Sequence, residues 1–409
     1  MRTIFILLLL LLSGCGSLSA LNKNIIQIDK QYKEVTITLP SSDRYVIIQL
    51  GSDDIADIKN VDISDGTNKI IIPSLIDRVS VIYLFKDKSH SLSYQKGQPL
   101  YRIETADLPD SGQALVIDDQ LLSPHPLENL ESVPLLSYFD IDIKQANIGN
   151  IVDFENDVFS PEAQHMGMWQ PLEFIERRYS GVFFLEPLDK NKIPVLFIHG
   201  MGGSGKEFEY LIDHMDRERY QAWIINYPSA LSLTVLAHSL SSLVTAIGDR
   251  YDFKAPLHIV AHSMGGVLTQ HYLNICSLQT QCNRIRSFTS IASPFNGVSS
   301  AQRGVQFSPV VMPSWRDIAP DSLIIKNLFN PELAQHKPPH YLMFAFDNSG
   351  LTSRTSGDGT IALSSQLVPA AQDQATRISG YNKNHTNVLK SKELSDDLNA
   401  FWLDIDSAN

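Results

Sequence analysis

The chain has 409 residues, of which 43% are apolar and 19% charged, so it is long enough for about two or three domains. These proportions exclude a largely disordered chain, a fibrous repeat and a small scaffold stapled by disulfides. The formal net charge of −12 argues against broad electrostatic attraction to nucleic acid or to an anionic membrane.

A short apolar run opens the chain. Residues 4–12 follow Arg2 and are too few to span a bilayer, which is typical of a secretory signal. The run ends in Leu-Ser-Gly-Cys at residues 12–15, which resembles the bacterial lipobox, in which the cysteine is linked to diacylglycerol and becomes the first residue after cleavage. The resemblance implies that residues 1–14 are a signal peptide and that Cys15 is lipidated.

Lipidation of Cys15 would anchor an exported protein in the bacterial envelope. Glycine rather than aspartate follows the cysteine, which resembles the class of lipoproteins sorted to the outer membrane. The alternative is an ordinary signal peptide cut near Ala20. Residues 15–24 are expected to form a lipidated tether.

Two further cysteines, Cys276 and Cys282, remain in a compartment that favours disulfides. Their separation of six residues permits one small disulfide, and two free buried thiols are the alternative. No metal-ligand spacing surrounds them, so no metal site is expected.

Residues 25–120 predict a small β-rich domain, an antiparallel sandwich. Short β-branched and aromatic runs alternate there with Ser, Asp and Gly turns, at residues 33–39, 45–50, 69–72 and 79–85. The domain holds no cluster typical of catalysis, so a spacer, a partner-binding module and a packed wall all remain open. Residues 121–180 contain several prolines and are expected to be a connecting region.

From residue 181 to 409 apolar strand-like runs alternate with helical stretches, which predicts βα units and a doubly wound, mostly parallel sheet. The expected strands are Val182–Leu185, Ile193–Ile198, Gln221–Asn226, Leu257–Ala261, Ile285–Ile291, Tyr341–Phe346 and Ala375–Ser379. The expected helices are Lys206–Met215, Leu231–Tyr251, Gly265–Cys276 and Lys392–Ile405.

One serine stands where an apolar strand passes directly into a helix. Residues 257–266 read Leu-His-Ile-Val-Ala-His-Ser-Met-Gly-Gly, and such a turn needs small residues two before and two after the serine. Ala261 and Gly265 meet this need, so Ser263 is the candidate nucleophile. The backbone N–H of Met264, at the start of the helix, is expected to face a developing oxyanion. A solvated loop serine is the alternative.

Residues 200–206, Gly-Met-Gly-Gly-Ser-Gly-Lys, match two nucleotide-binding patterns between a strand and a helix. Glu207 stands where a P-loop needs Ser or Thr, and it would place a carboxylate against the phosphates. Asn226 stands at the end of the next strand, where a dinucleotide site needs an acidic residue. We therefore expect no nucleotide.

A catalytic serine needs a histidine as general base and a carboxylate to orient it, in the chain order Ser, acid, His for doubly wound hydrolases. Asp358, between two glycines after the strand at 341–346, is the candidate acid, with Asp347 and then Asp373 as alternatives. His385, on a loop before the terminal helix, is the candidate base. The other downstream candidates, His271, His336 and His340, lie before the acid and violate the chain order.

With this order of residues the chain resembles the α/β-hydrolase superfamily. Within it the lipase-like branch related to GPI inositol-deacylases and lecithin–cholesterol acyltransferase-like enzymes has similar segments, the Gly-Asp-Gly-Thr turn at 357–360 and Ile-Ala-Ser-Pro-Phe-Asn-Gly at 291–297. The resemblance covers about residues 180–409. Ala261 for Gly and Ser293 for Thr depart from the usual pattern without threatening the chemistry.

The resemblance implies that the loop after strand 193–198 donates a second N–H to the oxyanion, which we assign to Met201. His199 is expected to organise this loop rather than carry a proton. About residues 295–340 are expected to form a cap above the site, whose apolar residues either bind an acyl chain or simply pack the cap.

These expectations describe an exported, membrane-anchored serine hydrolase that cleaves carboxylic esters, with a lipid or other acyl ester as substrate and no cofactor. An amidase or thioesterase would use the same residues. A different reading is a non-catalytic envelope lipoprotein whose β domain binds a protein partner. Fold alone does not decide between them.

Overall fold

The structure is a computed structural model, and it describes residues 16–28, 33–64, 68–74, 78–87, 94–109, 113–123, 127–130, 146–253, 255–278, 284–331, 337–348 and 356–407. The chain divides into two compact units. Ile25–Asp142 form one, the β unit, and Met1–Asn24 join Ile143–Asn409 in the other, the α/β unit.

The β unit contains two sheets. The smaller has the order β4-β1-β7 and the larger β3-β2-β5-β6, with bounds β1 Lys33–Thr38, β2 Tyr45–Leu50, β3 Ile58–Ser64, β4 Lys69–Ser74, β5 Val81–Lys86, β6 Leu100–Glu104 and β7 Ala114–Val116. Ile37 of the smaller sheet and Ile47 and Leu84 of the larger are fully buried in one shared core, so the unit is a sandwich. Its strand pairs are antiparallel except β1 with β7, which is parallel.

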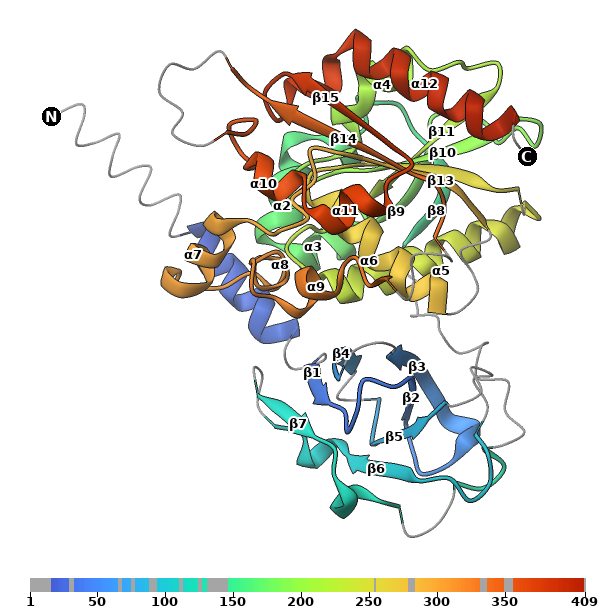
Figure 1. The fold of residues 1–409 in the computed structure, drawn as a ribbon, viewed down its shortest axis with the longest axis vertical. Coiled ribbons are helices and arrows are strands. Elements are labelled where there is room, and N and C mark those ends of the chain that lie inside the picture. Colours follow the sequence, from blue (N-terminus) through green and yellow to red (C-terminus); the bar gives the residue numbers. More distant parts are fainter. Residues whose placement is uncertain are drawn as a thin grey trace, which may run out of the picture. The chain divides into compact units, whose positions relative to one another are not determined.

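The α/β unit is built on an eight-stranded sheet (Figure 1). Its order is β15 Arg377–Asn382, β14 His340–Phe346, β13 Ile285–Ile291, β12 Leu257–His262, β10 Ile193–Ile198, β11 Tyr220–Asn226, β9 Gly181–Phe184 and β8 Asn147–Ile151. Neighbouring strands are parallel except β9 and β11, which are antiparallel. The predicted doubly wound, mostly parallel sheet is confirmed.

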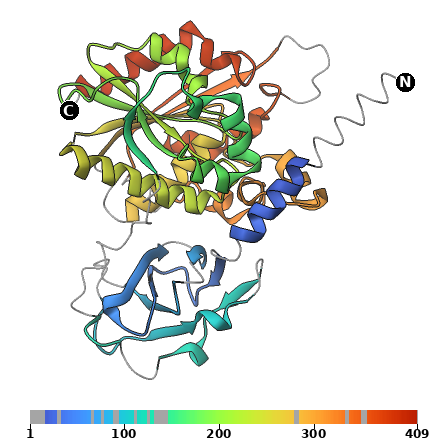
Figure 2. The same ribbon diagram turned by 180° about the vertical axis from the view of Figure 1, so that it is seen from behind.

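Helices cover both faces of this sheet (Figures 1 and 2). One face carries α5 Leu233–Tyr251, α6 Met264–Leu278 and α11 Pro369–Gln374, and the other carries α4 Glu209–Asp213 and α12 Lys392–Ser407. Successive residues of β12 therefore enter different cores, Ile259 below α5 and α6 and Val260 below α4 and α12. A strand buried on both faces reads as a continuous apolar run, as this one does.

The predicted cap is an insertion of short helices between β13 and β14. They are α7 Ser299–Phe307, α8 Pro313–Asp317 and α9 Leu323–Asn327. Met312 and Leu328 are fully buried, whereas the Phe307 side chain is 79% exposed.

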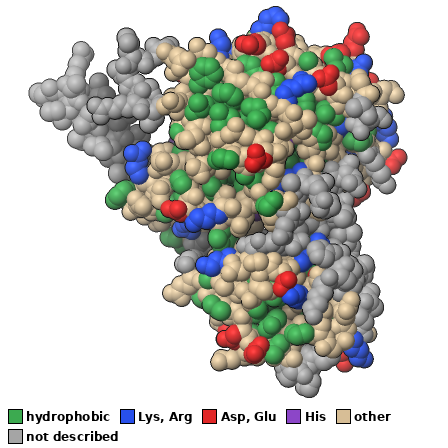
Figure 3. Space-filling model, viewed as in Figure 1, with side chains coloured by type: hydrophobic (Ala, Val, Ile, Leu, Met, Phe, Trp, Pro, Cys, Tyr) green, Lys and Arg blue, Asp and Glu red, His purple; other side chains and the backbone are tan. Residues whose placement is uncertain are grey.

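Elsewhere on the unit, Figure 3 shows hydrophobic side chains over the sheet edge at β14 and β15, where Ile378 is 40% exposed.

The residues expected to form a tether instead begin a helix, over residues 16–28. Leu21 is fully buried, the Asn24 Oδ1 accepts a hydrogen bond from the Leu172 N–H at 2.8 Å, and the Ser17 Oγ lies 3.3 Å from His165 Nε2. The expectation of a tether over 15–24 is corrected for the described part, because the buried Leu21 and the Asn24 bond fix the helix to the α/β unit.

The second half of the expected connecting region also belongs to the α/β unit. It contributes β8 and two helices, α2 Pro161–Trp169 and α3 Pro171–Glu176. Sequence reading took the prolines there as breakers, but Pro161 and Pro171 are each the first residue of a helix, where no N–H is needed.

Among the described residues, no helix combines the length and the apolar character required to cross a membrane. Cys276, in α6, is disulfide-bonded. Cys282, Cys15 and residues 1–14, which were predicted to be a signal peptide, lie outside the described residues.

Candidate active site

Ser263 stands alone between a strand and a helix. β12 ends at His262 and α6 begins at Met264, so one residue makes the whole turn, with a positive φ of 54°. A Cβ on Gly265 would lie 2.5 Å from the carbonyl oxygens of Ile198 and His199, so only glycine permits this approach. The turn holds Ser263 in a conformation that L-residues seldom adopt and that is typical of functional sites.

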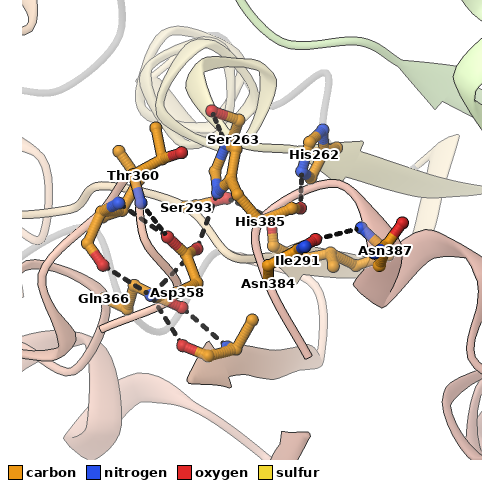
Figure 4. A network of polar contacts seen from close by, with 12 residues as sticks. His262, Ser263, Ile291, Ser293, Asp358, Thr360, Gln366, Asn384, His385 and Asn387 are labelled. Atoms are coloured by element: carbon orange, nitrogen blue, oxygen red, sulfur yellow. Dashed lines mark hydrogen bonds and ion pairs between the residues drawn. The ribbon is translucent and has the colours of Figure 1, made fainter. Parts of the chain in front are cut away.

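The three candidate residues form one chain of hydrogen bonds (Figure 4). The His385 Nε2 lies 2.9 Å from the Ser263 Oγ, and the His385 Nδ1 lies 2.6 Å from the Asp358 Oδ2. The His385 backbone N–H also donates to the Asp358 carbonyl at 3.0 Å. The acid thus holds both the ring and the backbone of the histidine.

Asp358 is fixed by its own turn. Its Oδ1 accepts hydrogen bonds from the Thr360 and Ile361 N–H groups at 2.9 and 2.7 Å, and the residue is 1% exposed. With the carboxylate accepting from Nδ1–H, the His385 Nε2 keeps its lone pair and accepts the hydroxyl proton of Ser263. The arrangement can therefore remove that proton, as a general base must.

The rival acids and bases lie elsewhere. The His385 ring is bonded to Asp358 and neither to Asp347 nor to Asp373. His271 is half-buried in α6, and loss of solvation there lowers its pKa to about 3. His340 begins β14 and accepts or donates to the Ser290 Oγ at 2.8 Å. His336 lies outside the described residues.

The backbone N–H groups of Met201 and Met264 were expected to face the oxyanion. Neither has a hydrogen-bond partner among the described residues. The next N–H, of Gly202, is occupied by the Ser229 Oγ at 2.9 Å. A Cβ on Gly200 would lie 2.8 Å from the Ser263 Cβ, so this loop runs directly beside the serine. Free donors beside a nucleophile are what a tetrahedral oxyanion requires.

His199 belongs to the framework of that loop. Its buried ring stacks on Tyr227 at 4.2 Å, and its Nδ1 lies 2.8 Å from the Gly200 carbonyl. Burial lowers its pKa, so the ring stays neutral at pH 7. Its Nε2 accepts the Tyr227 N–H at 3.4 Å, so the ring is no part of the relay from Ser263 through His385 to Asp358.

The charged residues at the end of the glycine-rich loop, residues 200–207, are paired with other protein groups and are not free to bind a phosphate. The Lys206 Nζ pairs with Glu155 at 2.6 Å. The Glu207 Oε1 accepts a hydrogen bond from the Gly200 N–H at 3.3 Å and lies 3.0 Å from the His262 Nδ1. The carboxylate that argued against a nucleotide in the sequence thus has two partners inside the site.

Ser263 and His385 line a cleft of about 700 Å³. Its larger apolar side chains are Met201, Tyr210 and Leu389, and its charged ones are Lys206, Glu207, Glu209, Asp213 and Lys390. The cleft therefore presents apolar surface and charged groups side by side next to the reacting atom.

Sequence reasoning missed Gln366, the last residue of α10 Leu363–Gln366. Its Nε2 donates to the Ala345 carbonyl at 3.0 Å and to the Asp358 Oδ2 at 3.3 Å, and its Oε1 accepts from the Ala345 N–H at 2.8 Å. It therefore fixes the acid turn to β14. A glutamine in a polar segment carries no signal of this kind. Sequence reasoning also missed His262, although it adjoins the nucleophile.

Within the parts of the chain that the structure describes, no cluster of three or more His, Cys, Asp or Glu side chains could hold a metal ion. The chemistry assembled here uses a hydroxyl, an imidazole, a carboxylate and backbone amides.

Comparison with known families finds that residues 195–380 match the model described as Alpha/beta hydrolase family. The matched residues run from β10 to β15, and the α/β unit has the α/β-hydrolase fold. A comparison with curated proteins found no match.

Several solved structures are similar. Mature lipase BlEst2 of Bacillus licheniformis is 16% identical, covering 54% of this chain and 97% of its own, with a TM-score of 0.44. A gene product of Listeria innocua is 14% identical, with 52% and 94% covered and a TM-score of 0.39. Est1E of Butyrivibrio proteoclasticus, bound to ferulic acid, is 9% identical, with 56% and 95% covered and a TM-score of 0.41. Likenesses at this level carry no argument about substrate.

Proposed function

We propose that the protein is a serine hydrolase of carboxylic esters. The observation that carries the proposal is the unbroken hydrogen-bonded chain from the Ser263 Oγ through His385 to Asp358, at 2.9 and 2.6 Å. Nucleophile, base and orienting acid in this relation are the parts of acyl transfer through a covalent intermediate.

In the first half-reaction the Ser263 Oγ attacks the ester carbonyl and the His385 Nε2 takes its proton. The oxyanion that forms accepts hydrogen bonds from the N–H groups of Met264 and Met201. The carbon–oxygen bond to the alcohol then breaks, and His385 gives its proton to the leaving oxygen. In the second half-reaction His385 takes a proton from water, which attacks the acyl-enzyme carbonyl. The bond to the Ser263 Oγ then breaks, His385 returns the proton to Ser263, and the carboxylic acid is released.

For the substrate we infer a lipid or other acyl ester. The charged side chains in the cleft beside Ser263 suit the alcohol portion of such an ester, and its apolar side chains, Met201, Tyr210 and Leu389, suit the acyl portion. The lipobox at Cys15 supports an exported protein held at the outer membrane, close to such lipids. Esters of graded acyl length, each with a small and a polyhydroxy alcohol, test both halves of this inference.

The nucleophile is tested by labelling the folded protein with a fluorophosphonate, which reacts only with an activated serine. We expect labelling of the native chain and none of Ser263→Ala. Labelling that persists in the variant would refute the nucleophile. No labelling of the folded native protein would favour the non-catalytic lipoprotein. Product analysis with matched ester, thioester and amide substrates separates the three hydrolase activities.

A further inference from the structure

His262, the residue before the candidate nucleophile, makes contacts that the reaction above does not use. Its Nδ1 lies 3.0 Å from the Glu207 Oε1, and its Nε2 lies 3.0 Å from the backbone carbonyl oxygen of His385. Figure 4 shows the second of these contacts, between the end of β12 and the loop that carries the base.

The chemistry of these two partners determines the protonation state of the ring. A carbonyl oxygen accepts hydrogen bonds and cannot donate, and an ionised carboxylate likewise only accepts. The Glu207 Oε1 also accepts the Gly200 N–H at 3.3 Å, so this oxygen acts as a hydrogen-bond acceptor. For both contacts to be hydrogen bonds, both ring nitrogens of His262 must carry a hydrogen, so the ring is an imidazolium.

The surroundings of His262 support a cation there. Its side chain is 4% exposed, and the titratable groups that act on it are Glu207, Asp358 and the neighbouring His199, with the His385 carbonyl on its other side. Burial is the largest single influence and opposes the charge, but the Glu207 carboxylate, the His385 carbonyl and Asp358 together outweigh it, and the pKa of His262 is raised above its ordinary value. A buried ion pair with its hydrogen bonds made is the form in which proteins retain such a charge.

We propose that His262, held as an imidazolium between Glu207 and the His385 carbonyl, is a positioning residue that joins the oxyanion loop to the base loop. The inference rests on the proposed hydrolase function. The Glu207 Oε1 contacts both the Gly200 N–H and the His262 ring, and so links the oxyanion loop to the end of β12. The His262 ring in turn contacts the His385 carbonyl, and so links the end of β12 to the base loop. The ring centroids of His262 and His385 lie 4.7 Å apart, so the positioning residue is packed directly against the base.

The test uses His262→Gln, because a glutamine amide can still donate to the His385 carbonyl but carries no charge. Loss of the charge removes the ion pair with Glu207, through which the oxyanion loop is held to β12. We expect kcat to fall by about tenfold, with KM within twofold of the native value. His214→Gln, an exposed histidine outside the cleft, is the matched control and should leave both constants unchanged.

A folded His262→Gln enzyme with kcat within twofold of the native value would overturn the proposal. If His262→Gln does not fold, the side-chain ¹⁵N spectrum of the native protein at pH 7 decides instead. We expect one histidine with both ring nitrogens protonated, and its loss in Glu207→Gln. A spectrum with no such histidine would overturn the proposal. Fluorophosphonate labelling of the native protein separates this outcome from failure of the hydrolase function, since labelling does not depend on the charge of His262.

Discussion

Replacing Asp358 by asparagine tests the proton relay with almost no change in shape. The Oδ1 of Asp358 accepts two backbone N–H groups, from Thr360 and Ile361, so the asparagine carbonyl oxygen will take that place. Its NH₂ group must then occupy the position of Oδ2, facing the His385 Nδ1. An NH₂ donates, so it selects the tautomer in which the hydrogen sits on Nε2 and points at Ser263.

That tautomer cannot accept the serine proton. The same exchange in serine proteases lowers kcat about 10⁴-fold, which corresponds to about 5 kcal/mol of transition-state stabilisation. The substitution also affects folding stability. The Gln366 Nε2 now lies 3.3 Å from the Asp358 Oδ2, an acceptor, and in the variant it will face the asparagine NH₂, a second donor. Gln366 keeps its bonds to Ala345, so we expect a further loss of only about 1 kcal/mol, in folding stability.

The assay is steady-state hydrolysis of a short, soluble nitrophenyl ester by Asp358→Asn, with folding checked by circular dichroism. Asp347→Asn and Asp373→Asn are the matched controls, and each should stay within twofold of the native kcat. A folded Asp358→Asn enzyme with more than a tenth of native activity would refute the reasoning. So would a loss of the expected size in either control.

Three further outcomes are expected. Gly265→Ala should lower the free energy of unfolding by about 1–3 kcal/mol, because its Cβ meets backbone oxygens that cannot move aside; urea unfolding followed by tryptophan fluorescence measures this, and unchanged stability would contradict it. Burial lowers the pKa of both His271 and His340 to about 3. The unfolded chain therefore binds more protons below pH 6.5, and stability should fall between pH 7 and pH 5 by about 2 kcal/mol for each histidine. His271→Gln should reduce this fall by about 2 kcal/mol, and an unaltered pH dependence of urea unfolding would contradict the assignment. Finally, Cys15→Ser should move the protein from the membrane fraction to the soluble fraction, and persistent membrane association would exclude the lipobox interpretation.

Much of the α/β unit was predictable because its signals are local. The strands Ile193–Ile198 and Ile285–Ile291 lie where expected, since strands buried on both faces are continuous apolar runs between polar turns. The turn at Ser263 needs small residues at fixed offsets, which the sequence shows directly. Chain order then selected Asp358 and His385, and the structure places both within hydrogen-bond distance of their expected partners.

The features that the sequence did not predict depend on contacts between distant residues, or on residue types that occur both in loops and at the ends of helices and strands. The edge strand β15 was expected at Ala375–Ser379 and lies at Arg377–Asn382, because an edge strand with polar residues on its open side has no continuous apolar run. The Glu207–His262 pair joins residues 55 positions apart, and no periodicity reports on such a contact. Pro161 and Pro171 start helices as readily as they end them, so the sequence alone favoured a loop.

The helix over residues 16–28 limits how far the α/β unit could move from a membrane. Lipidation of Cys15 would leave only Gly16 between the acylated residue and Ser17, whose hydroxyl already lies beside His165 of α2. An extended linker of ten residues would reach about 33 Å, whereas a single residue reaches about 3.5 Å. If Cys15 is lipidated, a connection this short would keep the α/β unit at the surface of the bilayer that holds the lipid.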